Sequence, residues 1–208
     1  MTAKFWNRLA KRYARAPVRH EDDYQEKLRK TREYLTPDSN VFEFGCGTGS
    51  TAIAHAPFVR HIHATDYSTQ MIEIARGKAE AAGIGNISFD VADFYQMDMS
   101  PDRFDMVMGH SILHLLEDVP LAISRVRSML KPGGIFVTST GCVSEVGGIL
   151  KALLNIVQIV RLIPRINAFS QADLEAMLVE AGFEIEYVWR PGKNKAAFIV
   201  ARNLNENS

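Results

Sequence analysis

The chain has 208 residues (23.3 kDa), is 47% hydrophobic and 23% charged, and balances 24 basic against 24 acidic residues, as expected of one folded domain. Its two cysteines, Cys46 and Cys142, lie far apart without metal-ligand spacing, which argues against a disulfide framework and against a metal site. The first residues lack the apolar core of a signal peptide, so a cytoplasmic protein is expected.

The N-terminal arm is basic and predicts an amphipathic helix. Residues 1–20 contain no acid, and an apolar stripe runs beside their cations. A helix of this kind can lie on an anionic membrane or on nucleic acid. A second helical pattern ends at Thr36-Pro37, so residues 1–37 form a separate N-terminal helical segment. The apolar stripe is Phe5, Trp6, Leu9 and Tyr13, and the cations are Lys4, Arg8, Lys11, Arg12 and Arg15.

From residue 38 onward, short apolar runs alternate with amphipathic stretches. This alternation predicts an α/β fold with a doubly wound, mostly parallel sheet and helices on both faces. Ser68 is expected to cap one helix and Gly83 to end it, while a later helix is expected to end at Lys131–Gly134. The expected strands are 40–44, 61–66, 87–93, 104–110 and 134–140, and the expected helices lie at 50–56, 68–83 and from about 117.

The C-terminal part of the pattern changes. A capped helix is expected over 170–183, followed by two strands at 184–190 and 196–202. A turn-rich "PGKNK" segment separates these strands, which indicates a hairpin. We therefore expect the sheet to end with an antiparallel strand.

Three glycines follow the first expected strand, in "VFEFGCGTGS" at 41–50. Gly45, Gly47 and Gly49 are spaced G-x-G-x-G, whereas the dinucleotide-binding fingerprint would require a glycine where Ser50 stands. Glycine destabilises the interior of an element, so three together indicate either positive φ or close approach of another group. In a doubly wound sheet, ligands bind at this end of the strands.

Five segments together resemble the class I S-adenosylmethionine-dependent methyltransferases of the small-molecule type, over roughly residues 38–201. The resemblance implies a Rossmann-like seven-stranded sheet in the order 3-2-1-4-5-7-6, with the last strand antiparallel, in a methyltransferase domain over 38–208. It also implies S-adenosylmethionine as cofactor, with S-adenosylhomocysteine as product. The segments are "VFEFGCGTGS", "HATDYSTQMIEIA", "ISFDVADF", "FDMVMGHSILHLL" and "LKPGGIFVTS".

The resemblance also implies which residues contact the cofactor. Glu43 would face its α-ammonium, Asp66 would accept both ribose hydroxyls, and Asp93 would accept from the adenine amino group. Asp66 as a helix cap and Asp90 in place of Asp93 stay open as alternatives. Cys46 is interpreted as a packed small residue of the turn and Met71 as either an adenine contact or core. The full expected set is Tyr13, Glu43, Gly45, Cys46, Gly47, Thr48, Gly49, Asp66, Tyr67, Met71, Ala92, Asp93, Phe94, Gly109 and His110.

Two histidines near the end of the fourth expected strand, His110 and His114, are candidate general bases. A base is needed only if the methyl acceptor still holds its proton. The family often has a second histidine where this chain has Leu115, so for His114 a packing role is an equal alternative. His110 is the first candidate.

The acceptor is expected to be a small, apolar or amphiphilic molecule. A helical cap insert at about 142–168 is very apolar, and three interpretations stay open: a core or homodimer contact, a lid over the acceptor, or a peripheral membrane contact. Related methyltransferases often carry an N-terminal lid helix, which favours a lid for residues 1–37 with Tyr13 over the cofactor. A lipid- or quinone-modifying enzyme at a membrane surface and a non-catalytic cofactor-binding protein are the alternatives; no nucleic-acid partner is expected.

Overall fold

The computed structural model describes residues 3–17, 20–98, 100–142, 167–192 and 195–204. Most of the insert expected at 142–168 lies outside these residues.

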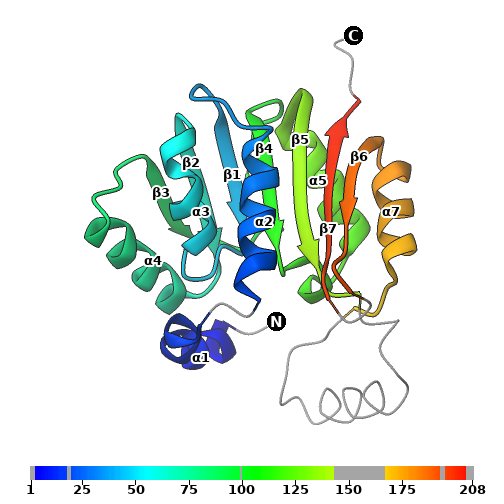
Figure 1. Ribbon diagram of the computed structural model, residues 1–208. Helices are drawn as coiled ribbons and strands as arrows, with labels where there is room; N and C mark the ends of the chain where they lie inside the picture. The colour runs from blue at the N-terminus through cyan, green and yellow to red at the C-terminus, as the bar shows by residue number, and fades with distance from the viewer. Residues whose placement is uncertain (1–2, 18–19, 99, 143–166, 193–194, 205–208) are drawn as a thin grey trace.

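A seven-stranded sheet forms the centre of the molecule, in the order β3-β2-β1-β4-β5-β7-β6 (Figure 1). All neighbouring pairs from β3 to β5 are parallel, and β7 pairs antiparallel with both β5 and β6. Both the strand order and the antiparallel strand confirm the expectation from sequence. The strands are β1 Asn40–Phe44, β2 His61–Asp66, β3 Ile87–Val91, β4 Phe104–His110, β5 Leu130–Thr140, β6 Phe183–Trp189 and β7 Ala197–Asn203.

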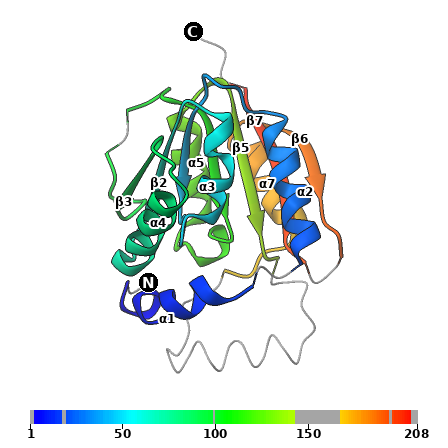
Figure 2. The ribbon, with the colours of Figure 1, turned by 60° about the vertical axis from the view of Figure 1, so that its left-hand side comes forward.

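Helices cover both faces of this sheet (Figures 1 and 2). On one face, α2, α3 and α4 enclose a core that contains Ile62, Met108 and Val137. On the other face, α5 and α7 enclose a core rich in phenylalanine. The helices are α1 Ala3–Arg15, α2 Glu21–Arg32, α3 Ser50–His55, α4 Thr69–Ala81, α5 Val119–Met129 and α7 Gln171–Glu180, with short 3-10 turns η1 Ala56–Phe58 and η2 Leu113–Leu115.

Side-chain caps set where several helices begin. The Ser68 hydroxyl accepts from the Met71 N–H at 3.2 Å, and Gly83 follows the end of α4 with φ of +68°. Ser170 and Asp173 form a reciprocal capping box at the start of α7. The predicted caps at Ser68 and Gly83 are confirmed.

Three element ends differ from the sequence expectation. The helix expected to reach Lys131–Gly134 ends at Met129, because Leu130 is fully buried and already pairs with Phe104 of β4. The third strand stops at Val91 instead of residue 93, because the chain turns there. The second helix ends at Arg32, before Thr36-Pro37.

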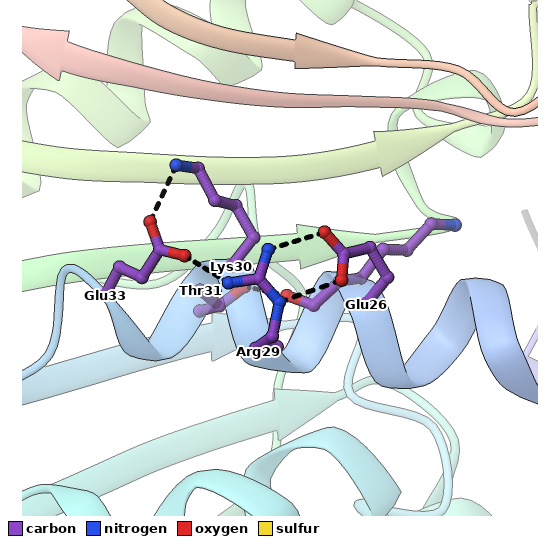
Figure 3. A network of polar contacts seen from close by, with 6 residues as sticks. Glu26, Arg29, Lys30, Thr31 and Glu33 are labelled. Carbon is purple, nitrogen blue, oxygen red and sulfur yellow. Dashed lines mark hydrogen bonds and ion pairs between the residues drawn. The ribbon is translucent and has the colours of Figure 1, made fainter.

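The exposed face of α2 carries a chain of ion pairs (Figure 3). Arg29 lies between Glu26 and Glu33, with nitrogen–oxygen distances of 2.7 and 2.6 Å, and Lys30 also pairs with Glu33 at 2.7 Å. Exposed pairs of this kind contribute roughly 0–1 kcal/mol each. The packing of α2 on the sheet therefore depends on its inward face.

Candidate functional site

The glycine turn connects β1 to α3 at the carboxyl ends of the parallel strands. Gly45, Gly47 and Gly49 all have positive φ, at +64°, +54° and +73°. A Cβ at Gly45 would lie 2.7 Å from Ile112, and one at Gly49 would lie 2.9 Å from Ala75. A Cβ at Gly47, in contrast, would have only one described neighbour within 4 Å, the Tyr13 ring at 3.9 Å. All three positions thus need glycine for conformation, but Gly47 is the one that leaves room for a ligand.

Asp66 ties this turn to the next strand and helix. One carboxylate oxygen accepts from the Gly47 N–H at 3.0 Å and the other from the Ser68 N–H at 2.9 Å. Burial raises the pKa of Asp66, and these N–H groups oppose that rise. A carboxylate has about four acceptor sites, so these two hydrogen bonds leave capacity for ribose hydroxyls. The helix cap itself is Ser68, which leaves Asp66 as the link between turn and helix.

Tyr67 and Asp93 lie close to Asp66. Burial is the main cause that raises the pKa of Tyr67 to about 12, and the charges of Asp66 and Asp93 add to the rise. The Ala92 N–H donates to the Asp66 carbonyl at 3.0 Å, which holds the start of the 92–97 turn against the end of β2. Asp93 is exposed, and its side chain accepts from the Tyr95 N–H at 2.9 Å.

The competing carboxylate, Asp90, is engaged elsewhere. It lies 2.9 Å from His63 and 3.8 Å from Arg76 on the outer part of the sheet. Of the two, therefore, only Asp93 lies beside Tyr67. Phe94 is 7% exposed and stacks on Phe44 at 4.4 Å between ring centroids, so its ring belongs to the core.

Glu43 supplies a buried carboxylate beside the turn. It is 2% exposed, and within the described residues its Oε2 has no hydrogen-bond partner. Burial raises its pKa to about 8; the Ala52 backbone opposes this rise, and the Asp66 charge adds to it. A buried carboxylate oxygen without a partner is costly unless a cation or donor completes it. The site therefore fits a ligand with a positively charged group at this position.

A proton should leave Glu43 when such a ligand binds. Below pH 8 the free protein holds Glu43 mostly protonated, and an ammonium beside it favours the charged form. We expect S-adenosylmethionine binding near pH 7 to release close to one proton, with affinity rising as pH rises towards about 8. Calorimetry in two buffers of different protonation enthalpy measures the release. Glu43→Gln should release none; an equal release from both proteins would contradict this assignment.

α1 lies across the carboxyl ends of the strands (Figures 1 and 2). The Asn7 side-chain oxygen accepts from the Ser68 hydroxyl at 2.6 Å and the Gln70 N–H at 3.3 Å, and Ala10 is fully buried. Tyr13 is 55% exposed, but burial of its hydroxyl, then the charges of Asp66 and Glu43, raise its pKa. The five cations of α1 are all exposed: Lys4, Arg8, Lys11, Arg12 and Arg15.

His110 ends β4 on the face covered by α2 and α3. Its Nε2 is buried without a hydrogen-bond partner in the described part of the chain. Burial, then the nearby charge of Lys27, lowers the pKa of His110 to about 4. The imidazole is therefore neutral near pH 7 and is a weaker base than an exposed histidine. The pKa of His114, in η2, is also lowered by burial, and its carbonyl accepts from the Asn167 N–H at 2.7 Å.

The remaining predicted residues pack around the turn. Cys46 is 8% exposed, and burial raises the pKa of its thiol, in keeping with a packing role. The Thr48 hydroxyl accepts from Lys78 at 2.9 Å. Met71 is 3% exposed, and a Cβ at Gly109 would lie 2.5 Å from the Phe44 ring.

Sequence reasoning missed a polar group next to His110. Lys27 reaches it from α2, His55 from α3 and Ser139 from β5. Burial, then the charges of His110 and Arg32, lowers the pKa of His55 to about 3. No local spacing signals this group, because Lys27 and Ser139 lie 112 residues apart in the chain.

Comparison with known proteins supports the geometry. A family model described as a methyltransferase domain matches residues 35–182. The chain is 29% identical over 100 residues to an uncharacterized methyltransferase, YcgJ, of Bacillus subtilis, covering 48% of this chain and 40% of that protein. It is 27% identical over 141 residues to a demethylmenaquinone methyltransferase of Leptospira interrogans, covering 64% of this chain and 57% of that protein. The chain thus spans only about half the length of these relatives.

The fold comparison agrees. An S-adenosylmethionine dependent methyltransferase from Mesorhizobium loti superposes with a TM-score of 0.68 at 23% identity, covering 85% of this chain and 96% of that one. The identity is low, so this likeness concerns the fold alone. Because the family model covers most of the chain, and the strand order is the one the resemblance implied, the chain belongs to the methyltransferase-domain family and has the class I fold.

Proposed function

We propose that the protein is an S-adenosylmethionine-dependent methyltransferase that acts on a small, apolar or amphiphilic molecule. The observation that carries the proposal is the convergence of Glu43, Gly47 and Asp66 at one turn. An orphaned buried carboxylate oxygen, a glycine with open space beside it and a carboxylate with acceptor sites left each suit a different part of that cofactor. Glu43 would face the ammonium of the cofactor, Gly47 the part that lies against the backbone of the turn, and Asp66 the ribose.

The cofactor supplies an electrophilic methyl group on a sulfonium. The chain's own residues then have to bind, orient and shield the reactants, an effect worth up to about 7–11 kcal/mol. In this proposal Tyr67, Met71 and Asp93 would hold the adenine end. α1, with Tyr13 above Gly47, acts as the lid of the 1–37 segment over the 38–208 domain.

A membrane-surface role is the second candidate, because α1 carries five exposed cations: Lys4, Arg8, Lys11, Arg12 and Arg15. The relative from Leptospira is named for a quinone, an acceptor type that would suit such a surface. Within the described ranges, no helix has the length and apolar character needed to cross a membrane. Cosedimentation with anionic and neutral vesicles tests this candidate; equal recovery with both, at low salt, would exclude it.

Two measurements test the main proposal. Calorimetry should show binding of S-adenosylmethionine and S-adenosylhomocysteine, and none of NADH. Incubation with methyl-labelled cofactor and a metabolite extract should then yield a labelled product. Binding without any labelled product would favour a non-catalytic cofactor-binding protein, and absence of binding would overturn the proposal.

Replacing His110 by alanine should lower turnover by a factor that is constant between about pH 6 and 9. With a pKa of about 4, the imidazole is already deprotonated throughout this range, so it contributes no pH dependence there. A base this weak should contribute no more than the low end of general-base catalysis, about 100-fold. Turnover against pH and S-adenosylhomocysteine affinity, which should stay unchanged, are the measurements. A loss that disappears below pH 7 would instead show a histidine titrating near its ordinary pKa.

A further inference from the structure

Lys27 points from α2 onto the sheet next to His110. Its Nζ donates to the Ser139 hydroxyl at 2.8 Å. Ser139 is the register partner of His110 on the neighbouring parallel strand, so both side chains lie on the same face of the sheet. Figure 2 shows α2 covering this face. A lysine, a hydroxyl and a buried imidazole therefore meet at the carboxyl ends of β4 and β5.

No acid in the described part of the chain is paired with the Lys27 ammonium. Within the described residues it forms no ion pair, and the nearby Asp23 is paired with Lys195. Desolvation lowers the pKa of Lys27, and Asp23 only partly offsets this. The imidazoles of His110 and His55 carry no compensating negative charge. Among the residues that the structure describes, this half-buried cation bonds to a hydroxyl alone, so an anion would complete it.

β4 separates this cation, at β5, from the proposed cofactor turn, which follows β1. Ile112 follows His110 by two residues, and its side chain would lie 2.7 Å from a Cβ at Gly45. The end of β4 therefore has the glycine turn on one side and the Lys27–Ser139 pair on the other. A group bound between them would be adjacent to both.

We propose that Lys27 and Ser139 form an oxyanion-binding site for the methyl acceptor, which carries an acidic hydroxyl, a phenol or an enol, and binds as its anion. This inference rests on the proposed function and deepens it. The ammonium makes a charge-assisted hydrogen bond to the oxyanion, and the Ser139 hydroxyl donates a second. Because the acceptor arrives ionised, no strong base is required, in agreement with a neutral His110. The same ammonium repels cationic amines, which excludes them as acceptors.

The test uses the full chain loaded with S-adenosylhomocysteine and two probes of similar shape, 4-nitrophenol and nitrobenzene. Wild type should bind 4-nitrophenol in its phenolate form, visible as the phenolate absorption band, and more tightly than nitrobenzene. Lys27→Met should weaken 4-nitrophenol binding by about 10- to 100-fold and leave nitrobenzene unchanged. Lys27→Arg should retain most of the phenolate binding, and Ser139→Ala should lose part of it.

Lys30→Met is the matched control, since Lys30 lies on the same helix but pairs with Glu33 on its exposed side (Figure 3). It should bind both probes as wild type does. Failure of 4-nitrophenol to bind the loaded protein, or equal binding by wild type and Lys27→Met, would overturn the inference. S-adenosylhomocysteine affinity is measured on the same samples. If that ligand fails to bind wild type, the proposed function itself is wrong, so the two failures are distinguishable.

Discussion

Gly49→Ala is expected to destabilise the protein by about 2–5 kcal/mol. The substitution places an L-residue at φ of +73°, which costs about 1–2 kcal/mol. The new Cβ would also lie 2.9 Å from both Ala75 and the Phe89 ring, and overpacking of this kind costs about 1–3 kcal/mol more. Thermal unfolding should therefore occur roughly 5–15 °C below wild type.

Substitutions at two other glycines distinguish the conformational cost from the packing cost. Gly83 has a similar φ of +68° but nothing within 4 Å of a Cβ, so Gly83→Ala should lose only the conformational part, about 1–2 kcal/mol. Gly77 lies inside α4 with open space around it, so Gly77→Ala should stabilise by about 0.5–1 kcal/mol. If Gly49→Ala cost no more than Gly83→Ala, the close packing of the turn against α4 and β3 would be disproved.

Asp66→Ala should weaken S-adenosylmethionine binding by about 10- to 100-fold or more. It removes the carboxylate that organises the Gly47 N–H and, in the proposed site, accepts from the ribose hydroxyls. A hydrogen bond to a charged group is worth about 1.5–3 kcal/mol, which corresponds to that range. Titration calorimetry of wild type and variant gives the ratio directly.

The controls address whether Asp66 acts on the ligand or only on the turn. Asp66→Asn keeps one acceptor for a backbone N–H and should fold like wild type, yet it loses the charge and most of the affinity. Asp90→Asn, on the neighbouring strand, should bind normally because Asp90 is engaged with His63 and Arg76. Equal affinity of wild type and Asp66→Ala would remove Asp66 from the cofactor site.

Much of the fold follows from local pattern and family resemblance. The Ser68 cap and Gly83 set the limits of α4, and "PGKNK" separates the strands that become β6 and β7. The errors fall at element ends, where burial overrides turn chemistry. The Pro-Gly-Gly segment predicted the end of a helix, but Leu130 is already buried and paired in β5.

The candidate site likewise contains residues that local motifs predict and residues that only the packing of the fold brings together. Glu43, Gly47 and Asp66 lie in motifs that are short in sequence, so their positions could be predicted. Lys27 and Ser139 meet only because α2 packs across β4 and β5, a contact between residues 112 apart that no local pattern records. The neutral state of His110 is also hidden from sequence, because it depends on burial beneath that helix.

The position of β7 has a consequence for synthesis on the ribosome. β7 follows every other described strand in the chain, yet it lies between β5 and β6 and contributes Ile199 to one core and Val200 to the other. A nascent chain that has emerged only as far as β6 therefore carries β5 with one unpaired edge, a template for association with other chains. Neither core can close until Ala197–Asn203 has left the exit tunnel. Folding of the domain should accordingly be completed only after translation of β7, and protection of the open β5 edge by a chaperone would suppress aggregation until then.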